Sequence, residues 1–271
     1  MPEPESRELR DASGPLAGST ALVTGGAKRI GRAIALRLAA AGANVAITYR
    51  NSQPEAEETV RALAAFDVDA FAVRTDLTDA ESIRQSVAAV VDEFGRLDIL
   101  VNNAGLFEAA ALEEITPEQW DRMFATNTRA PFLMAQAALP YLRATRGRGG
   151  RIINIGSLGG SHPWATHAHY CASKAALHML SQTMAKAWAP EVSVNCVVPG
   201  MIVQGIDAQG MDAQGMDAQG GIDPAYAHFA EKTPMRRNGS AEDVAAAVLF
   251  FTTCPHFITG QLLAVDGGLG L

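Results

Sequence analysis

The sequence predicts an α/β protein built on a single doubly wound parallel sheet with helices on both faces. Apolar stretches of strand length alternate with helical ones from residue 19 onward, and no linker interrupts them. A glycine-rich turn leads from the first of these strands directly into a helix. The length of 271 residues also suits one large α/β domain. We therefore expect a flexible N-terminal tail over residues 1–18 and one Rossmann-like dinucleotide-binding and catalytic domain over residues 19–271.

Seven segments are strand candidates because they are rich in β-branched residues and bounded by Gly, Asp or Asn. They are Thr20–Val23, Asn44–Thr48, Ala70–Arg74, Ile99–Val101, Arg151–Ile155, Ser193–Val197 and Gln261–Val265. Apolar side chains four residues apart predict a helix over Ile30–Ala41, and a second helix over Ala80–Phe94 ends before Gly95. A third helix is expected over His169–Ala187. Together these elements predict a seven-stranded sheet with covering helices.

Residues 205–219 form a short internal repeat of three pentapeptides, GIDAQ, GMDAQ and GMDAQ. A glycine at every fifth position weakens a helix, and three short repeats are too few for a solenoid. The segment is therefore expected to be an insertion in the substrate loop or lid near the site. A loop expansion without function is the alternative, because long surface insertions cost little free energy.

Composition excludes several classes of protein. The chain has 22 basic and 29 acidic residues, a net charge of −7, and its basic residues are scattered, so no nucleic-acid or membrane partner is expected. The apolar run from Val244 to Phe251 is too short to span a bilayer. The N-terminus lacks the pattern of a secretory signal, and the three cysteines form no C-x-x-C pair. We expect a cytoplasmic protein.

The turn Thr24–Gly31 reads T-G-G-A-K-R-I-G and has the features of a phosphate-binding loop. Glycines permit close backbone approach, and the following helix offers free N–H groups to a pyrophosphate. Arg50 follows the second strand, where no carboxylate is present to bind the ribose hydroxyls of NAD, and the turn itself carries Lys28 and Arg29. These cations favour a 2′-phosphate and hence NADPH over NADH, with a solvated surface role for Arg50 as the alternative.

Tyr170 and Lys174 are four residues apart in a predicted helix, so they lie on one helix face. A free phenol has a pKa of about 10. An ammonium about 4 Å away would lower the pKa of Tyr170 by about three units, to near 7, and fit it for acid–base work. Ser157 follows the fifth strand at the carboxyl edge of the sheet, where its hydroxyl is expected to contact a substrate oxygen beside Tyr170.

The segment between Ser157 and Tyr170 carries Trp164, which is expected either to line the substrate face or to pack there. His162, His167 and His169 lie in the same segment. They have no carboxylate or thiolate companion on a fixed scaffold, so no metal site is expected.

The chain resembles the short-chain dehydrogenase/reductase family from Ser19 onward. The residues that carry the resemblance are the T-G-x-x-x-x-x-G turn Thr24–Gly31, Asp76-Leu77, Asn102-Asn103-Ala104-Gly105, Asn127, Ser157, Tyr170-x-x-x-Lys174 and Pro199-Gly200. The resemblance implies that Tyr170 protonates a carbonyl oxygen as NADPH delivers hydride and that Ser157 polarises this carbonyl. It also implies that Lys174 binds the nicotinamide ribose, that Asn127 holds a water in a proton relay, and that the chain is a homotetramer.

The cofactor site expected from the turn and from the resemblance draws on most of the predicted strand ends. Asp76 and Leu77 would flank the adenine, and Pro199-Gly200 would border the nicotinamide. The expected cofactor residues are Gly25, Lys28, Arg29, Ile30, Gly31, Tyr49, Arg50, Asn51, Ser52, Asp76, Leu77, Asn103, Ala104, Gly105, Tyr170, Lys174, Pro199, Gly200 and Ile202.

Finer similarities point to two branches of the family. The segments Ala27–Gly31, Tyr49–Ser52 and Ile258–Gly268 resemble pteridine reductases. Ser157, however, stands where those enzymes typically carry an aspartate, and serine is the form seen in carbonyl reductases and 3-oxoacyl-carrier-protein reductases. We expect an NADPH-dependent reductase of a ketone or 3-oxoacyl carbonyl, with pteridine reduction as the alternative. A non-catalytic NADPH-sensing scaffold is a third possibility, although it would not need Asn127, Ser157, Tyr170 and Lys174 together.

Overall fold

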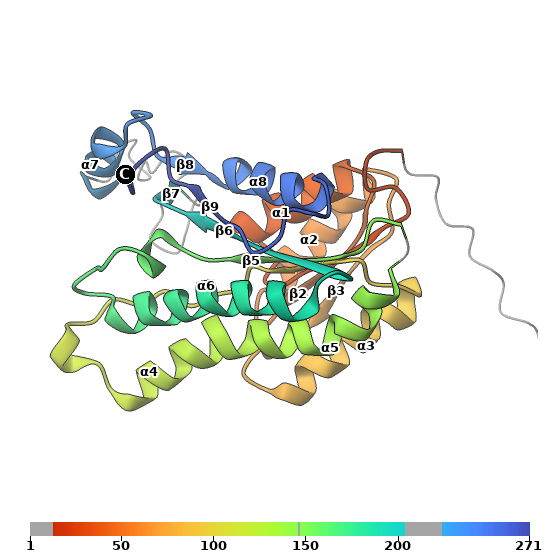
Figure 1. The fold of residues 1–271 in the computed structure, drawn as a ribbon, viewed down its shortest axis with the longest axis horizontal. Helices are drawn as coiled ribbons and strands as arrows, with labels where there is room; N and C mark the ends of the chain where they lie inside the picture. The colour runs from red at the N-terminus through yellow and green to blue at the C-terminus, as the bar shows by residue number, and fades with distance from the viewer. Residues whose placement is uncertain (1–12, 146, 204–223) are drawn as a thin grey trace, which may run out of the picture.

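The computed structural model describes residues 13–145, 147–203 and 224–271. Seven parallel strands form one sheet in the order β3-β2-β1-β4-β5-β6-β9, and helices cover both of its faces (Figure 1). The strands are β1 Thr20–Val23, β2 Asn44–Tyr49, β3 Ala70–Arg74, β4 Ile99–Asn102, β5 Gly150–Ile155, β6 Val192–Pro199 and β9 Leu262–Val265. The predicted fold class is confirmed.

Two hydrophobic cores lie on opposite faces of the sheet. On one face α1 Arg29–Ala40, α2 Gln53–Ala64 and α8 Ala241–Thr253 bury residues such as Ile34 and Val248. On the other face α3 Ala80–Phe94, α5 Ala130–Ala144 and α6 Ala168–Trp188 bury residues such as Val87 and Met134. Because both faces are covered, the central strands are apolar on both sides rather than alternating.

Local sequence signals explain where several helices begin and end. Asp79 caps α3 by accepting hydrogen bonds from two backbone N–H groups, and Gly95 ends the helix with φ of 71°. Thr116 forms a capping box at the start of α4 Pro117–Phe124, and Ser240 forms one at the start of α8. A π-helical turn, Ala125–Arg129, then joins α4 to α5.

The predicted bounds differ from the observed ones by one or two residues in most elements. The largest difference is in β6, which extends to Pro199 because its last residues pair with β9 as far as Val265. Two short strands outside the main sheet, β7 Ile202–Val203 and β8 Gly239–Ser240, pair with each other and precede and follow α7 Pro224–Lys232. The described chain also has 3₁₀ turns at Leu112–Glu114 and Leu158–Gly160.

The flexible tail expected over residues 1–18 is wrong for its last six residues. Leu16 is buried in the core against α1, and its backbone N–H donates to the carbonyl of Ala41 at 2.8 Å. The ordered chain therefore begins before the first strand, because an apolar side chain in the tail fills space at the end of α1. Residues 1–12 and the predicted insertion 205–219 lie outside the described residues.

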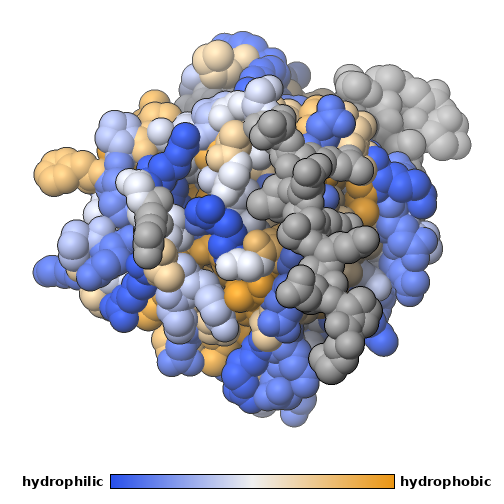
Figure 2. All heavy atoms as spheres, turned by 90° about the vertical axis from the view of Figure 1, so that its right-hand side faces the viewer, coloured by the Kyte–Doolittle hydropathy of each residue, from blue (hydrophilic) through white to orange (hydrophobic). Residues whose placement is uncertain are grey.

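The strand order reverses between β1 and β4, so a crevice forms at the carboxyl edge of the sheet between these strands. Figure 2 shows the opposite side of the molecule, at the amino ends of the strands, where hydrophilic side chains predominate and some hydrophobic ones show between them. A cavity of about 310 Å³ on that side is lined in part by Arg96, Asp98 and Arg151. No helix among the described residues is both long and apolar enough to cross a membrane.

Candidate active site

The turn after β1 is shaped by glycines at the two ends of the predicted phosphate-binding motif. Gly25 has φ of 63°, a conformation that favours glycine, and its N–H donates to the Thr48 hydroxyl at 3.2 Å. A side chain at Gly31 would collide with the carbonyl of Gly25. The N-terminus of α1 is thereby brought next to β1, where its free N–H groups can receive a phosphate.

A second segment, after β4, holds this turn in place. The Asn103 side-chain amide donates to the carbonyls of Thr24 at 2.9 Å and Gly25 at 3.3 Å. In return the Thr24 hydroxyl accepts from the backbone N–H groups of Asn103 and Ala104, each at 3.0 Å. The structure thus brings together three of the predicted cofactor residues, Gly25, Asn103 and Ala104. It adds Thr24, which the sequence analysis noted only as the first residue of the glycine-rich motif.

The cations expected around a 2′-phosphate are exposed at the edge of the crevice. Lys28 and Arg29 lie at the start of α1, and Arg50 lies directly after β2. Arg74, which the sequence analysis did not single out, joins them because its Nε donates to the Arg50 carbonyl at 3.2 Å. Its place at the end of the neighbouring strand β3 was the only sequence signal for it.

Asp76, expected beside the adenine, is held by its own loop. Its carboxylate accepts from the N–H of Thr78 at 2.9 Å and from the Thr78 hydroxyl at 2.7 Å. These bonds lower the pKa of Asp76, and the charges of Arg50 and Arg74 lower it further. The carboxylate therefore remains ionised beside these two cations.

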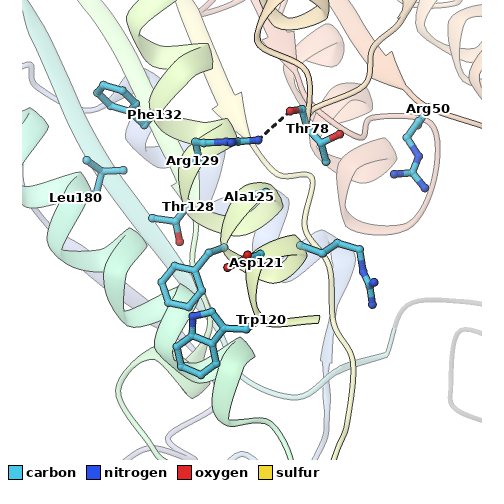
Figure 3. A pocket seen from close by; sticks show the side chains of 11 residues that line it. Arg50, Thr78, Trp120, Asp121, Ala125, Thr128, Arg129, Phe132 and Leu180 are labelled. Atoms are coloured by element: carbon cyan, nitrogen blue, oxygen red, sulfur yellow. Dashed lines mark hydrogen bonds between the residues drawn. The ribbon is translucent and has the colours of Figure 1, made fainter. Parts of the chain in front are cut away.

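A cavity of about 1010 Å³ adjoins this edge and runs along α4 and α5 (Figure 3). Arg50 and Thr78 line one side of it, and Arg129 crosses toward Thr78, whose carbonyl it binds at 2.9 Å. Trp120 and Phe124 stack on each other with ring centroids 5.2 Å apart. Ser157, Tyr170 and Lys174 are not among the residues that line this cavity.

The predicted catalytic side chains converge at the carboxyl ends of β4 and β5. Ser157 caps the 3₁₀ turn after β5, where its hydroxyl accepts from the Gly159 N–H at 3.1 Å, and it is 5% exposed. The hydroxyl lies close enough to the phenol of Tyr170 to influence its pKa. Lys174 lies one turn further along α6, 5.9 Å from the centroid of the Tyr170 ring, and donates from Nζ to the Ile155 carbonyl at 2.8 Å. The separation of four residues, read from the sequence, therefore places Tyr170 and Lys174 against the loop that carries Ser157.

The expectation that Lys174 brings the pKa of Tyr170 near 7 is wrong for this structure. Burial disfavours the phenolate and raises the pKa of Tyr170 to about 12, although the nearby Ser157 hydroxyl opposes this rise. The Lys174 ammonium binds a backbone carbonyl rather than the phenol oxygen. Tyr170 is consequently held in its protonated form, which is the form a general acid needs.

Burial acts on Lys174 in the opposite direction from its effect on a phenol. Removing the ammonium from water lowers the pKa of Lys174 to about 8. The group is still mainly charged at neutral pH, and it is one of the few buried charges among the described residues. Perturbed titrating groups that meet in one crevice are typical of functional sites.

Asn127 lies in the π-helical turn between α4 and α5 and is fully buried. Its side chain bridges two segments: it accepts from the Leu106 N–H at 2.7 Å and donates to the Leu106 carbonyl at 2.9 Å and the Ser173 hydroxyl at 3.0 Å. Gly105 lies against both Asn127 and Lys174. Single π-turns inside helices are frequent at functional sites, and this one brings Asn127 to α6.

Two aromatic rings contact Tyr170. Trp164 stacks on the Tyr170 ring with centroids 6.0 Å apart, and Phe107 meets it edge-on at 4.8 Å. Phe107 is 61% exposed and also stacks on His167 at 4.6 Å. The structure thus packs Trp164 against Tyr170 and adds Phe107 and His167, which no spacing rule linked to Tyr170.

His178 is another residue that the sequence analysis missed. It follows Lys174 by four residues on α6, is 5% exposed, and accepts a hydrogen bond from the Ser157 N–H at 3.4 Å through Nε2. Burial, together with the nearby Lys174 charge, lowers the pKa of His178 to about 4, so the ring is neutral near pH 7. The signal in the sequence was that Tyr170, Lys174 and His178 follow one another at intervals of four residues.

The remaining predicted cofactor residues lie around the same edge of the sheet. Pro199 ends β6, Gly200 packs closely on Asp266, and Ile202 lies in β7. Tyr49 ends β2, and Asn51 and Ser52 lead into α2. Across the described residues, no group of three or more His, Cys, Asp or Glu side chains could hold a metal ion.

Comparison with known proteins identifies the family. Residues 25–270 match the family model described as enoyl-(acyl carrier protein) reductase. The chain is 38% identical over 256 residues to an uncharacterized oxidoreductase of Methylorubrum extorquens, covering 94% of this chain and 98% of the relative. It is 36% identical over 252 residues to the 3-oxoacyl-[acyl-carrier-protein] reductase of Staphylococcus aureus, covering 92% and 97%.

Among solved structures, a short-chain dehydrogenase from Burkholderia cenocepacia J2315, crystallised in complex with NADP, superposes with a TM-score of 0.83. It is 38% identical in sequence, and the match covers 95% of this chain and all of that one. The chain belongs to the short-chain dehydrogenase/reductase family and is an oxidoreductase.

Proposed function

We propose that the protein is an NADPH-dependent reductase that converts a ketone or 3-oxoacyl carbonyl into an alcohol. The observation that carries the proposal is the convergence of three buried side chains, Ser157, Tyr170 and Lys174, at the carboxyl edge of the sheet. NADPH, when bound, supplies the hydride to the carbonyl carbon. The carbonyl oxygen receives its proton from Tyr170, so the products are an alcohol and NADP⁺.

Each polar residue of the site has a separate role in this proposal. The Ser157 hydroxyl donates a hydrogen bond to the substrate oxygen and polarises the carbonyl. Tyr170, kept protonated by burial, is the general acid. Lys174 would bind the nicotinamide ribose and place a positive charge next to the Tyr170 phenolate that forms during the reaction. Asn127 would hold a water molecule that returns a proton to the Tyr170 phenolate.

The cofactor preference rests on the cations at the adenosine end. Lys28, Arg29 and Arg50, together with Arg74, would bind the 2′-phosphate that distinguishes NADPH from NADH. The NADP bound to the Burkholderia relative supports this preference. Arg50→Ala should weaken NADPH binding about tenfold and leave NADH binding nearly unchanged, as measured by fluorescence titration. Equal weakening of both would overturn the assignment.

Tyr170→Phe tests the catalytic role directly. The variant keeps the ring contacts with Trp164 and Phe107 and loses only the hydroxyl. Turnover should fall by about 10³-fold or more while NADPH still binds. If the wild-type protein binds NADPH and reduces no carbonyl, and the variant matches it in every respect, the non-catalytic scaffold is the better description.

A substrate panel separates the carbonyl proposal from pteridine reduction. Oxidation of NADPH should be followed by absorbance with a 3-oxoacyl thioester, a vicinal diketone, a quinone, dihydrobiopterin and a 2-enoyl thioester. Turnover of a ketone, diketone or 3-oxoacyl thioester supports the proposal. Turnover of dihydrobiopterin alone would favour the pteridine alternative, and turnover of the enoyl thioester alone would indicate reduction of a carbon–carbon double bond.

The assembly expected is a homotetramer. β9 is an edge strand of the sheet, and its Leu262 and Leu263 side chains are more than one-third exposed. Trp120 and Phe132, beside the large cavity on α4 and α5, are similarly exposed. A second copy covering each surface would remove this apolar area from water. Sedimentation should give about four times the chain mass of 28.6 kDa, and a monomer at micromolar concentration would contradict this assembly.

A further inference from the structure

The face of α6 that carries Tyr170 and Lys174 continues to a third polar residue, His178. The three residues are spaced by four, so they lie one above another along the helix. All three are buried, and all three face the segment that follows β5. Lys174 donates to the carbonyl of Ile155, the last residue of β5, and His178 binds the N–H of Ser157 two residues later.

The His178 ring fits between the two glycines that flank the Ser157 turn. A Cβ atom built on Gly156 would collide with Nε2 of His178, and one on Gly160 would lie 2.5 Å from Cε1. The ring thus occupies space that any other residue at those positions would fill. Because Gly156 and Gly160 bracket Ser157, this contact fixes both ends of the turn on α6.

We propose that His178 is a positioning residue that holds the Ser157 turn on α6 and thereby sets the distance between the Ser157 and Tyr170 hydroxyls. The proposal rests on the proposed carbonyl reduction. Ser157 lies on a loop and Tyr170 on a helix, and small displacements between reacting groups lower rates steeply. His178 supplies a rigid, aromatic link between the two elements, with its Nε2 accepting from the Ser157 N–H.

Two substitutions separate the hydrogen bond from the volume of the ring. His178→Met keeps a side chain of comparable volume and removes the strong acceptor, so it leaves the buried Ser157 N–H without a good partner. His178→Gln keeps an acceptor that can reach the same N–H. We expect His178→Met to lower kcat for ketone reduction by about ten- to hundredfold with the KM for NADPH unchanged, and His178→Gln to restore most of kcat.

Hydrogen exchange gives a readout that does not depend on turnover. The backbone N–H groups of residues 156–160 should exchange faster in His178→Met than in the wild type and should be protected again in His178→Gln. Met184→Ala, a truncation at a buried position further along the same helix, is the matched control. This control should lower the stability of the protein. It should leave hydrogen exchange in the Ser157 turn, and the value of kcat, the same as in the wild type.

The outcomes distinguish the two proposals. If no carbonyl substrate is found but hydrogen exchange in the Ser157 turn responds as expected, the proposed function is wrong. The result still supports the proposal that His178 holds the turn on α6. Equal loss of kcat in His178→Met, His178→Gln and Met184→Ala would overturn the positioning role, because destabilisation of α6 would then explain the effect. Unchanged exchange and unchanged kcat in His178→Met would overturn it as well.

Discussion

At the scale of single residues, burial decides the chemistry of the site. The sequence shows the spacing of Tyr170 and Lys174, and this spacing carries no information about the solvent around them. In the structure burial raises the pKa of Tyr170 to about 12 and lowers that of Lys174 to about 8. Both shifts favour the neutral forms, as low-dielectric surroundings do. The pair is therefore a neutral phenol beside an ammonium that loses its proton more readily than a lysine in water.

This ionisation state predicts the pH dependence of ketone reduction. Tyr170 stays protonated far above neutral pH, whereas the Lys174 ammonium is lost as the pH rises through about 8. The value of kcat/KM should therefore be flat between pH 6 and 7.5 and should fall above about pH 8. Steady-state rates measured across this pH range give the profile of kcat/KM. A decrease in kcat/KM that starts near pH 7, in proportion to formation of the Tyr170 phenolate, would contradict the prediction.

Lys174→Arg provides the comparison for that profile. An arginine remains charged throughout the accessible range. The variant should lose activity because the guanidinium is larger than the ammonium, yet the remaining activity should no longer fall near pH 8. A fall that persists at the same pH would show that another group titrates there.

At the scale of elements, the loops after β1 and β4 form one unit. Asn103 donates to two carbonyls of the phosphate-binding turn, and Thr24 accepts from two N–H groups of the β4 loop. The turn carries the glycines that a phosphate needs, but its position relative to α1 is set by this neighbouring loop. Each bond of this kind contributes about 1 kcal/mol to stability.

Asn103→Ala should therefore affect both stability and cofactor binding. The free energy of unfolding should decrease by about 1–2 kcal/mol, because two carbonyls lose their donor. NADPH affinity should fall by about tenfold as the turn loosens. Urea denaturation and fluorescence titration measure the two effects. Gln85→Ala, an exposed change on α3, is the control, and an equal effect there would rule out a specific role for Asn103.

At the scale of the whole molecule, one sheet joins two separate cores. Leu38 lies in the core on the α1 side and Met134 in the core on the α5 side, and both are fully buried. Strands β1 and β4 lie in the middle of the sheet and contribute side chains to both faces. We expect the two cores to unfold together, because neither layer of helices retains a partner without the sheet.

Leu38→Ala and Met134→Ala test this coupling. Each should decrease the free energy of unfolding by about 2–5 kcal/mol. In each variant, far-ultraviolet circular dichroism and tryptophan fluorescence should report one coincident transition in urea. Two separated transitions in either variant would show that the layers unfold independently.

The sequence by itself determined the class of fold, the seven strands of the sheet, the phosphate-binding turn and the Tyr170–Lys174 spacing. These features depend on local periodicity and on glycines that neighbouring residues reveal. Only the tertiary structure decided the ionisation of Tyr170, the packing of Leu16, and the contacts of Phe107 with Tyr170 and of His178 with Ser157. The reason is physical: burial and contacts between distant segments arise when the sheet brings separate loops to one edge, and no local pattern records which side chains meet there.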